Sequence, residues 1–192
     1  SDRAGGPESL VGNFQPKARL GLSNSFTYGH FALRVLVDGR IGGVAVSGTE
    51  LNLAHNGVTE ATAAYREGGW VLGGVDMDGN PVNKGITAQQ FWQAASNQRN
   101  GTGVFFMYDA TSFRVRELSL GYDFPIKFKL VKAARLSAVA RNLFWIYRGS
   151  SKLDVPGLSK RKMWMDPDIG SVGNNQVGNE YGLMPSTRSV GL

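Results

Sequence analysis

The chain has 192 residues, a net charge of +6 and no cysteine, which excludes disulfides, thiolate metal sites and cysteine catalysis. Its 26 glycines against 7 prolines favour turns and strands over long helices. The basic residues are spread along the sequence instead of forming one cluster, so we expect no nucleic-acid partner. Residues 1–6 do not resemble a signal peptide, so a leader would have been removed or would lie upstream in a longer protein.

The first predicted element is a hairpin of two long strands joined at residues 29–30. Apolar residues alternate with polar ones, with Asn24 and Leu36 out of phase. The apolar positions are Leu20, Leu22, Phe26 and Tyr28, then Phe31, Leu33, Val35, Val37 and Ile41. Strands of this length exceed the usual mode of about 5–6 residues. They favour an outer-membrane barrel, whose apolar face meets lipid, over a soluble sandwich.

Residues 45–110 are predicted to form a long insertion between strands. Apolar residues recur at helical spacing between residues 47 and 66, with a break expected at Gly57. A glycine-rich run and a turn-rich stretch follow, and Thr87 is expected to cap a second helix over residues 88–95. Long connections are usually functional. In a barrel they lie on the extracellular side.

Two further strands are predicted after the insertion. The first begins at Ser112 and ends before Pro125, which has no amide hydrogen to donate to a neighbouring strand. The second covers residues 135–147. Aromatic residues near the strand ends on one side would form a membrane-interface girdle. These residues are Tyr28, Tyr122, Phe124 and Phe128.

Two arginines conflict with the apolar alternation of the first of these strands. Arg114 and Arg116 fall in phase with Leu118. A charge that faces lipid costs about 2–4 kcal/mol at mid-membrane. We therefore predict that these arginines lie beyond the lipid or that a β-bulge resets the register. Arg114, Arg116 and Glu117 would then form ion pairs on the lumen side.

Four segments resemble, in the same order, the C-terminal part of SusC/RagA-type TonB-dependent outer-membrane transporters. They are residues 25–28 with 37–43, the run YDATSFRVRELSLGY at 108–122, ARNLF at 140–144, and GLMPSTRS at 182–189. Within these segments, the residues that match the family's structural motifs are Arg114, Arg116, Glu117, Arg141, Asn142, Leu143 and Phe144.

The resemblance implies an all-β fold, an antiparallel long-stranded segment of a large outer-membrane β-barrel of roughly 22 strands. Residues 1–192 would be the C-terminal portion of the barrel, without the plug domain or the end of the last strand. The implied location is the bacterial outer membrane, in contact with its lipid. The family imports glycan oligosaccharides or peptides with a SusD-like surface lipoprotein, driven by the TonB complex through regions missing here.

Two other classes remain as alternatives. One is a soluble β-rich carbohydrate-binding or adhesion module, and the other is a structural surface-layer protein. A soluble module would enclose the apolar faces of its strands in a core, whereas a barrel segment would leave them exposed to lipid. The side chains of Leu33, Val35, Leu118 and Leu120 therefore distinguish the two arrangements.

The candidate ligand-binding residues are aromatic and basic residues of the predicted extracellular segments. They are Tyr65, Arg66, Trp70, Trp92, Arg99 and Trp164, with Phe91 and Arg161 nearby in the same segments. Aromatic faces offer sugars an apolar surface, and polar neighbours fix their orientation. The alternative is that these residues form the core of the loop itself or pack against the lipoprotein partner.

No catalytic residue, metal site or cofactor is predicted. Neither His30 nor His55 lies near a nucleophile motif, and two histidines so placed are poor zinc ligands. The turn at residues 76–80 carries oxygen side chains at alternate positions. Pro81 nevertheless stands where an EF-hand needs glycine, and Thr87 where it needs glutamate, so a solvated turn is favoured over a calcium site.

Overall fold

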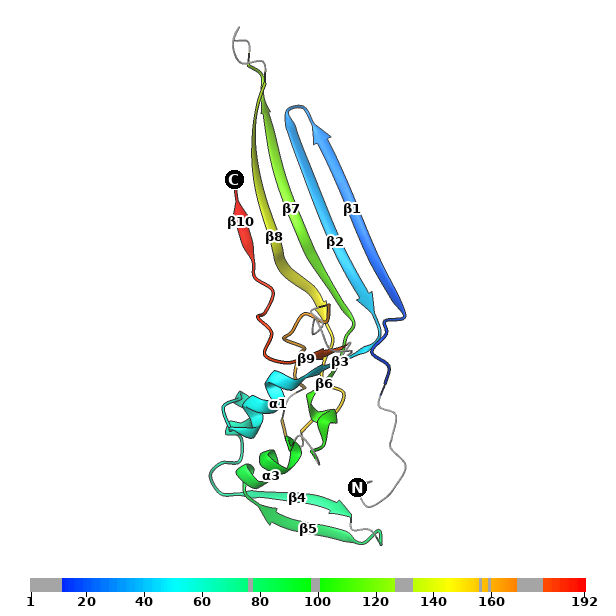
Figure 1. Cartoon of the computed structure of the whole chain (residues 1–192), viewed down its shortest axis with the longest axis vertical. Helices are drawn as coiled ribbons and strands as arrows, with labels where there is room; N and C mark the ends of the chain where they lie inside the picture. The colour runs from blue at the N-terminus through cyan, green and yellow to red at the C-terminus, as the bar shows by residue number, and fades with distance from the viewer. Residues whose placement is uncertain are drawn as a thin grey trace.

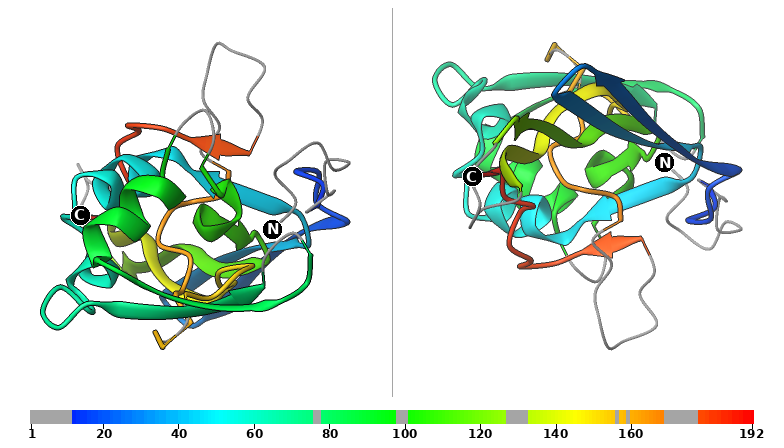
Figure 2. Two further views of the ribbon diagram at one scale, coloured as in Figure 1. Left: turned by 90° about the horizontal axis from the view of Figure 1, so that it is seen from below. Right: turned by 90° about the horizontal axis from the view of Figure 1, so that it is seen from above.

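The computed structural model describes residues 12–75, 78–97, 101–126, 133–155, 157–158, 160–168 and 178–192. A tall five-stranded sheet stands on a compact body formed by the connections at one end of the strands (Figure 1). Viewed along the long axis from that end, the helices and the hairpin of β4 (Trp70–Val75) and β5 (Pro81–Ile86) lie across the end of the sheet (Figure 2). No helix among the described residues is long and apolar enough to cross a membrane.

The sheet is antiparallel throughout, in the order β1-β2-β7-β8-β10. Its strands are β1 (Ala18–Tyr28), β2 (Phe31–Ile41), β7 (Ser112–Phe124), β8 (Ala134–Arg148) and β10 (Ser189–Gly191). The predicted long-stranded, antiparallel all-β architecture is confirmed, including the two-residue turn between β1 and β2. Gly29 adopts φ 58° in that turn, a left-handed conformation that glycine reaches without strain.

The register of the strands collects the apolar residues on one face. Phe26 lies opposite Leu33, Leu33 lies opposite Leu120, and Leu120 lies opposite Ala138. This face is not enclosed in a core: Phe26 is 59% exposed and Leu120 is 47% exposed. Leu33, Val35 and Leu118 are half-buried. The upper part of the sheet is a single layer in Figure 1.

A β-bulge in β7, next to an irregularity in β8, removes the conflict between the arginines and the apolar alternation of β7. Arg116 is an extra residue in β7, because Glu117 pairs with Leu36 of β2 while Val115 pairs with the next residue, Val37. On β8, Asn142 lies within the matching irregularity and adopts φ 51°. The shift places Val115 on the apolar face and Arg114 on the polar face. The predicted β-bulge is confirmed.

The compact body is built from the β2–β7 insertion and the connection after β8. Its elements are β3 (Val44–Ser47), α1 (Gly48–His55), α2 (Glu60–Ala63), β4 (Trp70–Val75), β5 (Pro81–Ile86), α3 (Ala88–Ala95), η1 (Gly103–Phe106), β6 (Met107–Asp109) and β9 (Asn179–Glu180). β3 pairs antiparallel with β6 and parallel with β9. The insertion is therefore partly helical, as predicted for residues 45–110.

The helix boundaries follow local signals in the sequence. α1 and α2 are separated near Gly57, which adopts φ 71°. Thr87 and Gln90 form a capping box at the start of α3: the Thr87 hydroxyl accepts from the Gln90 amide at 3.1 Å, and the Gln90 side chain accepts from the Thr87 amide at 3.0 Å. The β4–β5 hairpin was not predicted, because its glycine-rich strands carry little apolar alternation.

Two hydrophobic clusters hold the body together. The larger one contains Ala54, Trp70, Ala88, Trp92, Phe106 and Val155. The smaller one contains Ala45, Tyr108, Ala110, Met163 and Met165. Both join the insertion to the connection after β8, so the two long connections form one packed unit.

The bulge at Asn142 gives a test of the fold. Valine at this position would be strained at positive φ and would lose the amide hydrogen bond to the Thr187 carbonyl (3.0 Å), at a combined cost of about 2–4 kcal/mol. Asn142→Gly loses the same side-chain hydrogen bonds, including the weak one from Arg116 Nη1 at 3.5 Å, but adds no backbone strain, so it costs about 1 kcal/mol. Urea denaturation should therefore give a lower midpoint for Asn142→Val than for Asn142→Gly. Equal midpoints for the two variants would contradict this role of the backbone.

Candidate ligand-binding site and the ion pairs that position it

A buried ion-pair network joins the polar face of the sheet to the connection after β8. The Arg114 Nε atom lies 3.2 Å from Asp38 Oδ1, and its Nη1 atom pairs with Asp166 Oδ2. The side chains of Arg114 and Asp166 are each 4% exposed. Arg116 donates to Asp38 Oδ2 at 2.7 Å and lies 3.7 Å from Asp168. Removing one partner of such a pair is costly because it leaves a buried charge uncompensated.

A second arginine fixes the same segment from β2. Arg40 is buried, and it donates to the carbonyl oxygens of Pro167 (3.0 Å) and Phe14 (2.6 Å). Its Nη1 atom also lies 3.5 Å from Asp168 Oδ1. Residues 166–168 are therefore held on the polar face of the sheet from both β2 and β7.

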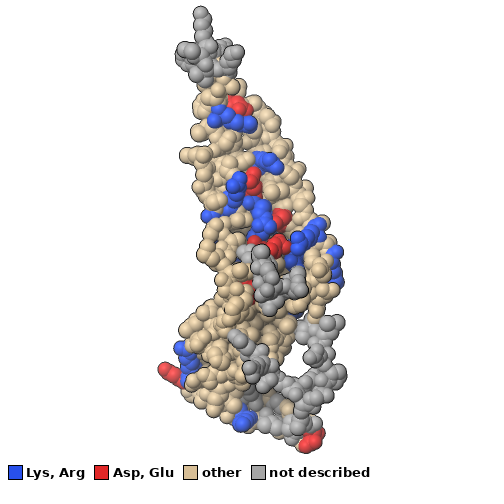
Figure 3. All heavy atoms as spheres, in the orientation of Figure 1, with Lys and Arg blue, Asp and Glu red and all other residues tan. Residues whose placement is uncertain are grey.

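Exposed ion pairs continue along the same face towards the far end of the strands. Glu117 pairs with Arg141 at 3.1 Å, and Asp123 pairs with Arg135 at 3.3 Å. Figure 3 shows charged side chains following one another along the sheet face turned towards the viewer. The predicted ion pairs of Arg114, Arg116 and Glu117 are thus present. The exposed ones contribute little to stability because water screens them.

The body contains a buried cluster around Glu50. The Tyr108 hydroxyl donates to Glu50 Oε2, and Arg161 pairs with Glu50 Oε1. Arg161 also donates to the Phe105 carbonyl. Burial, and then the Glu50 charge and its hydrogen bond, raise the pKa of Tyr108 well above its ordinary value. The phenol therefore stays protonated and keeps donating to Glu50.

Two further carboxylates are fixed by hydroxyl groups. Buried Glu180 of β9 accepts from Ser47 (2.9 Å) and Thr49 (2.5 Å), which ties β9 to the start of α1. Asp109 of β6 accepts from the Thr111 amide (3.0 Å) and hydroxyl (2.7 Å). Burial acts to raise the pKa of Asp109, but the Thr111 hydrogen bonds and the charge of Lys152 outweigh it and lower the pKa below its ordinary value.

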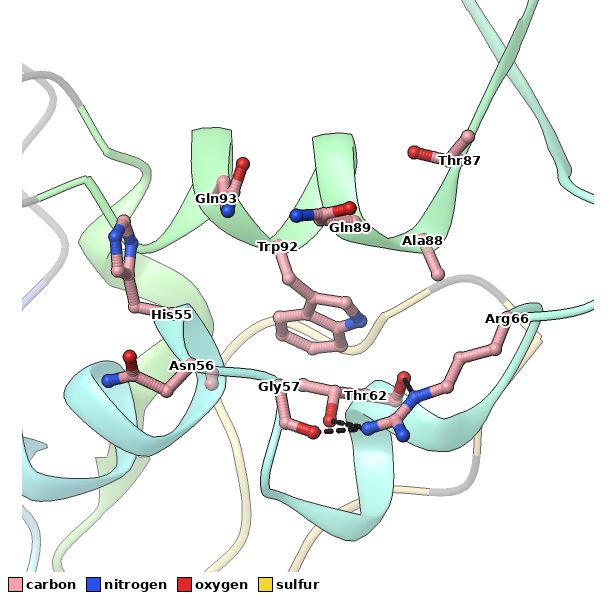
Figure 4. A pocket seen from close by; sticks show the side chains of 11 residues that line it. His55, Asn56, Gly57, Thr62, Arg66, Thr87, Ala88, Gln89, Trp92 and Gln93 are labelled. Carbon is pink, nitrogen blue, oxygen red and sulfur yellow. Dashed lines mark hydrogen bonds between the residues drawn. The ribbon is translucent and has the colours of Figure 1, made fainter.

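The helices border an open hollow of about 660 Å³, here called the amide hollow. It is lined by Ala54, His55, Asn56, Gly57, Thr62, Arg66, Thr87, Ala88, Gln89, Trp92 and Gln93. In Figure 4, Trp92 extends from α3 into the space above α1 and α2, with Arg66 on one side and His55 on the other. Arg66 is held by the Thr62 carbonyl at 2.9 Å and by the Gly57 carbonyl.

A second hollow, of about 710 Å³, lies between the insertion and the connection after β8. We call it the Trp164 hollow. It is lined by Glu50, Leu53, Thr59, Glu60, Ala61, Tyr108, Leu158, Lys160, Arg161, Lys162 and Trp164. It combines apolar side chains with a basic rim, whereas the amide hollow carries the amide side chains of Asn56, Gln89 and Gln93 in its lining.

The structure does not bring the candidate ligand residues together into one site. Trp70 and Trp92 are buried in the larger cluster, and Tyr65 stacks on Trp70 at 4.6 Å. Arg66 and Trp92 line the amide hollow, and Trp164 lines the other. Arg99 and the turn residues Asp76 and Met77 lie outside the described residues. A ligand role for these side chains stays a prediction.

Sequence reasoning did not single out several residues of the Trp164 hollow. Arg161 was among the predicted basic residues, but its partner Glu50 was not, because the two are 111 positions apart and no local spacing links them. Leu53, Lys160 and Lys162 lie in ordinary helix and loop sequence. The described residues contain no group of three or more histidines or carboxylates placed to hold a metal ion.

No protein-family model and no curated protein matches the chain. Among solved structures it is similar to the RagAB peptide importer in its closed-closed state, with 16% identity and a TM-score of 0.46. For the open-open state of that importer the identity is 15% and the TM-score is 0.43. Each match covers 70% of this chain and 14% of the importer chain, so the chain spans a small part of the length of these structures.

The buried network gives a test on the Asp166 segment. Asp166→Asn removes a charge-assisted hydrogen bond from Arg114 and should destabilise the segment by about 1.5–3 kcal/mol. Hydrogen exchange in the full-length protein should show faster exchange at residues 160–168. Asp123→Asn is the matched control, because its pair with Arg135 is exposed and contributes at most about 1 kcal/mol. Unchanged exchange in Asp166→Asn would exclude the anchoring role.

Proposed function

We propose that this chain is part of the wall of an outer-membrane TonB-dependent transporter, with residues 45–110 on the extracellular side. The observation that carries the proposal is a single-layered sheet with one uncovered apolar face and one charged face. Phe26, Leu120 and Leu136 are about half exposed on the first face. Ion pairs of Arg114, Arg116 and Glu117 lie on the second. In a barrel, the apolar face would contact the surrounding lipid and the charged face would contact water in the lumen.

The two ends of the sheet differ in a way that supports this orientation. The β1–β2 connection is a two-residue turn, whereas the β2–β7 connection at the opposite end forms most of the compact body (Figure 1). Outer-membrane barrels have short periplasmic turns and long extracellular loops. The compact body would therefore lie outside the cell.

Aromatic residues at the turn end fit a membrane interface. Tyr122 contacts Phe31 at 4.7 Å and Phe124 at 4.9 Å between ring centroids, and Tyr28 lies opposite Phe31 in the β1–β2 register. Such a group at the end of a barrel wall would form part of the periplasmic aromatic girdle. Phe128, expected in the same girdle, lies outside the described residues.

A soluble sandwich is less compatible with this arrangement. It would need a second sheet packed about 10 Å from the apolar face, whereas the two smaller sheets of the described residues lie in the compact body (Figure 1). β1 also presents an unpaired edge of 11 residues within the described sheet, which invites pairing with another strand. In a barrel, neighbouring strands would close that edge.

The proposed activity is import of oligosaccharides or peptides without chemical change to the substrate. This chain would form part of the barrel wall and of the outer binding surface. A SusD-like surface lipoprotein would cover that surface, and the TonB complex would supply energy through regions outside residues 1–192. The support for these partners is the order of the family-like segments in the sequence, including residues 108–122 and 140–144.

A pair of adjacent substitutions in the full-length protein tests the membrane placement. Leu22→Arg puts a charge on the apolar face and should cost about 2–4 kcal/mol in lipid, whereas Ser23→Arg places the same side chain on the polar face. The measurement is the amount of heat-modifiable, folded protein in isolated outer membranes. Leu22→Arg should lower it strongly, and Ser23→Arg should stay near wild type. Equal yields, or recovery of the wild-type protein as a detergent-free soluble monomer, would reject the proposal.

A further inference from the structure

We propose that the Trp164 hollow binds an apolar side chain that stands next to a carboxylate, the chemistry of an acidic peptide. The inference rests on the proposed transport function and narrows its substrate class to such peptides. The hollow lies between the two long connections of the compact body.

The walls of the hollow offer accessible apolar surface. Leu53 is 43% exposed and Trp164 is 38% exposed, and both line the cavity together with Ala61 and Leu158. An exposed indole face and an exposed aliphatic side chain in one hollow suit an apolar or aromatic side chain of a ligand. The cavity volume of about 710 Å³ leaves room for several residues of a peptide.

The floor of the hollow is already satisfied by its own hydrogen bonds. Both oxygens of Glu50 are engaged, one by Tyr108 and the other by Arg161. Arg161 is also bonded to the Phe105 carbonyl. Because the charges of Glu50 and Arg161 compensate each other and their side chains are held in place, the ligand would be recognised by the side chains of the walls and the rim.

The rim is predominantly basic. Lys160 and Lys162 are exposed and flank Arg161, whose charge is taken up by Glu50. Lys162 Nζ lies 5.8 Å from the centroid of the Tyr147 ring. Glu60 is the other carboxylate in the lining, so the two lysines leave the rim with net positive charge. Two lysines in the lining of a partly apolar hollow favour a ligand with a carboxylate next to an apolar group.

The side chains of this hollow suit neutral sugars less well than those of the amide hollow. Amide side chains both donate and accept hydrogen bonds, as sugar hydroxyls do, whereas lysine only donates and an ionised carboxylate only accepts. The Trp164 hollow has no asparagine or glutamine in its lining. Asn56, Gln89 and Gln93 belong instead to the amide hollow. The two cavities therefore differ in the ligand chemistry that they can recognise.

The position of Trp164 connects the hollow to the barrel wall. Trp164 precedes Asp166 by two residues, and Asp166 is paired with Arg114 of β7. Trp164, Asp166 and Arg114 also line one small cavity of about 110 Å³ on the polar side of the sheet. A ligand seated on Trp164 would thus lie close to the water-filled side of the proposed wall.

The experiment uses the full-length protein in detergent and fluorescence anisotropy of labelled, amidated tetrapeptides. The probe is Ala-Phe-Glu-Ala, the charge control is Ala-Phe-Gln-Ala, and a neutral glucan heptasaccharide is the third ligand. The glutamate peptide should bind about three- to tenfold more tightly than the glutamine peptide, as expected for two partly exposed lysine contacts. Lys160→Gln combined with Lys162→Gln should abolish this ratio.

Matched variants separate the hollow from general charge effects. Lys152→Gln removes a positive charge outside the hollow, where Lys152 Nζ lies 4.0 Å from Asp109, and should preserve the ratio. Trp164→Ala should weaken both peptides by about tenfold or more, as for other aromatic anchors. The lysine variants change only exposed side chains, so they remain informative if Trp164→Ala fails to fold.

Several results would overturn the inference. They are a ratio near one in the wild-type protein, a ratio unchanged by the paired lysine variant, or binding of the glucan in place of the peptides. Loss of lipoprotein co-purification in Trp164→Ala with unchanged peptide binding would assign the hollow to the partner instead. Binding in detergent does not depend on membrane insertion, so failure here is distinguishable from failure of the Leu22→Arg and Ser23→Arg test.

Discussion

The pairing of Arg114 with Asp38 and Asp166 is the interaction on which the arrangement of this chain depends. Arg114 is buried, and a buried charge is tolerated only when it is compensated. One partner comes from the neighbouring strand and the other from the connection after β8. The pairing therefore fixes that connection on the sheet. Trp164, two residues before Asp166, is positioned by the same contact.

The pairing is possible because β7 and β8 depart from regular strand pairing near Arg116 and Asn142. Without the extra residue at Arg116, the alternation of β7 would place Arg114 on the same face as Leu118. The bulge and the positive φ of Asn142 shift the register and move Arg114 to the polar side. The apolar face continues past this level with Val115 opposite Val37. A local backbone feature thus keeps the apolar and charged faces separate along the whole sheet.

Most aromatic residues of the insertion serve its own packing. Trp70 and Trp92 are buried together in the larger cluster, and Tyr65 and Phe91 contact Trp70. A long connection needs such a core to hold one conformation. The surface that remains contains two hollows of different chemistry, one rich in amides and one with an exposed indole and lysines. Their difference makes it possible to assign separate ligand classes to them.

The sequence by itself determined the features that depend on near neighbours. Alternation fixed the long strands and their apolar face, Gly29 and Gly57 marked a turn and a helix break, and Thr87 marked the start of α3. The conflict of Arg114 and Arg116 with the apolar alternation indicated either a position beyond the predicted lipid contact or a bulge, and the structure has the bulge. Only the tertiary structure decided which distant residues meet. The contacts of Glu50 with Arg161 and of Arg114 with Asp166 span 111 and 52 positions. Such pairs have no periodic signature, because chain folding rather than local spacing brings them together.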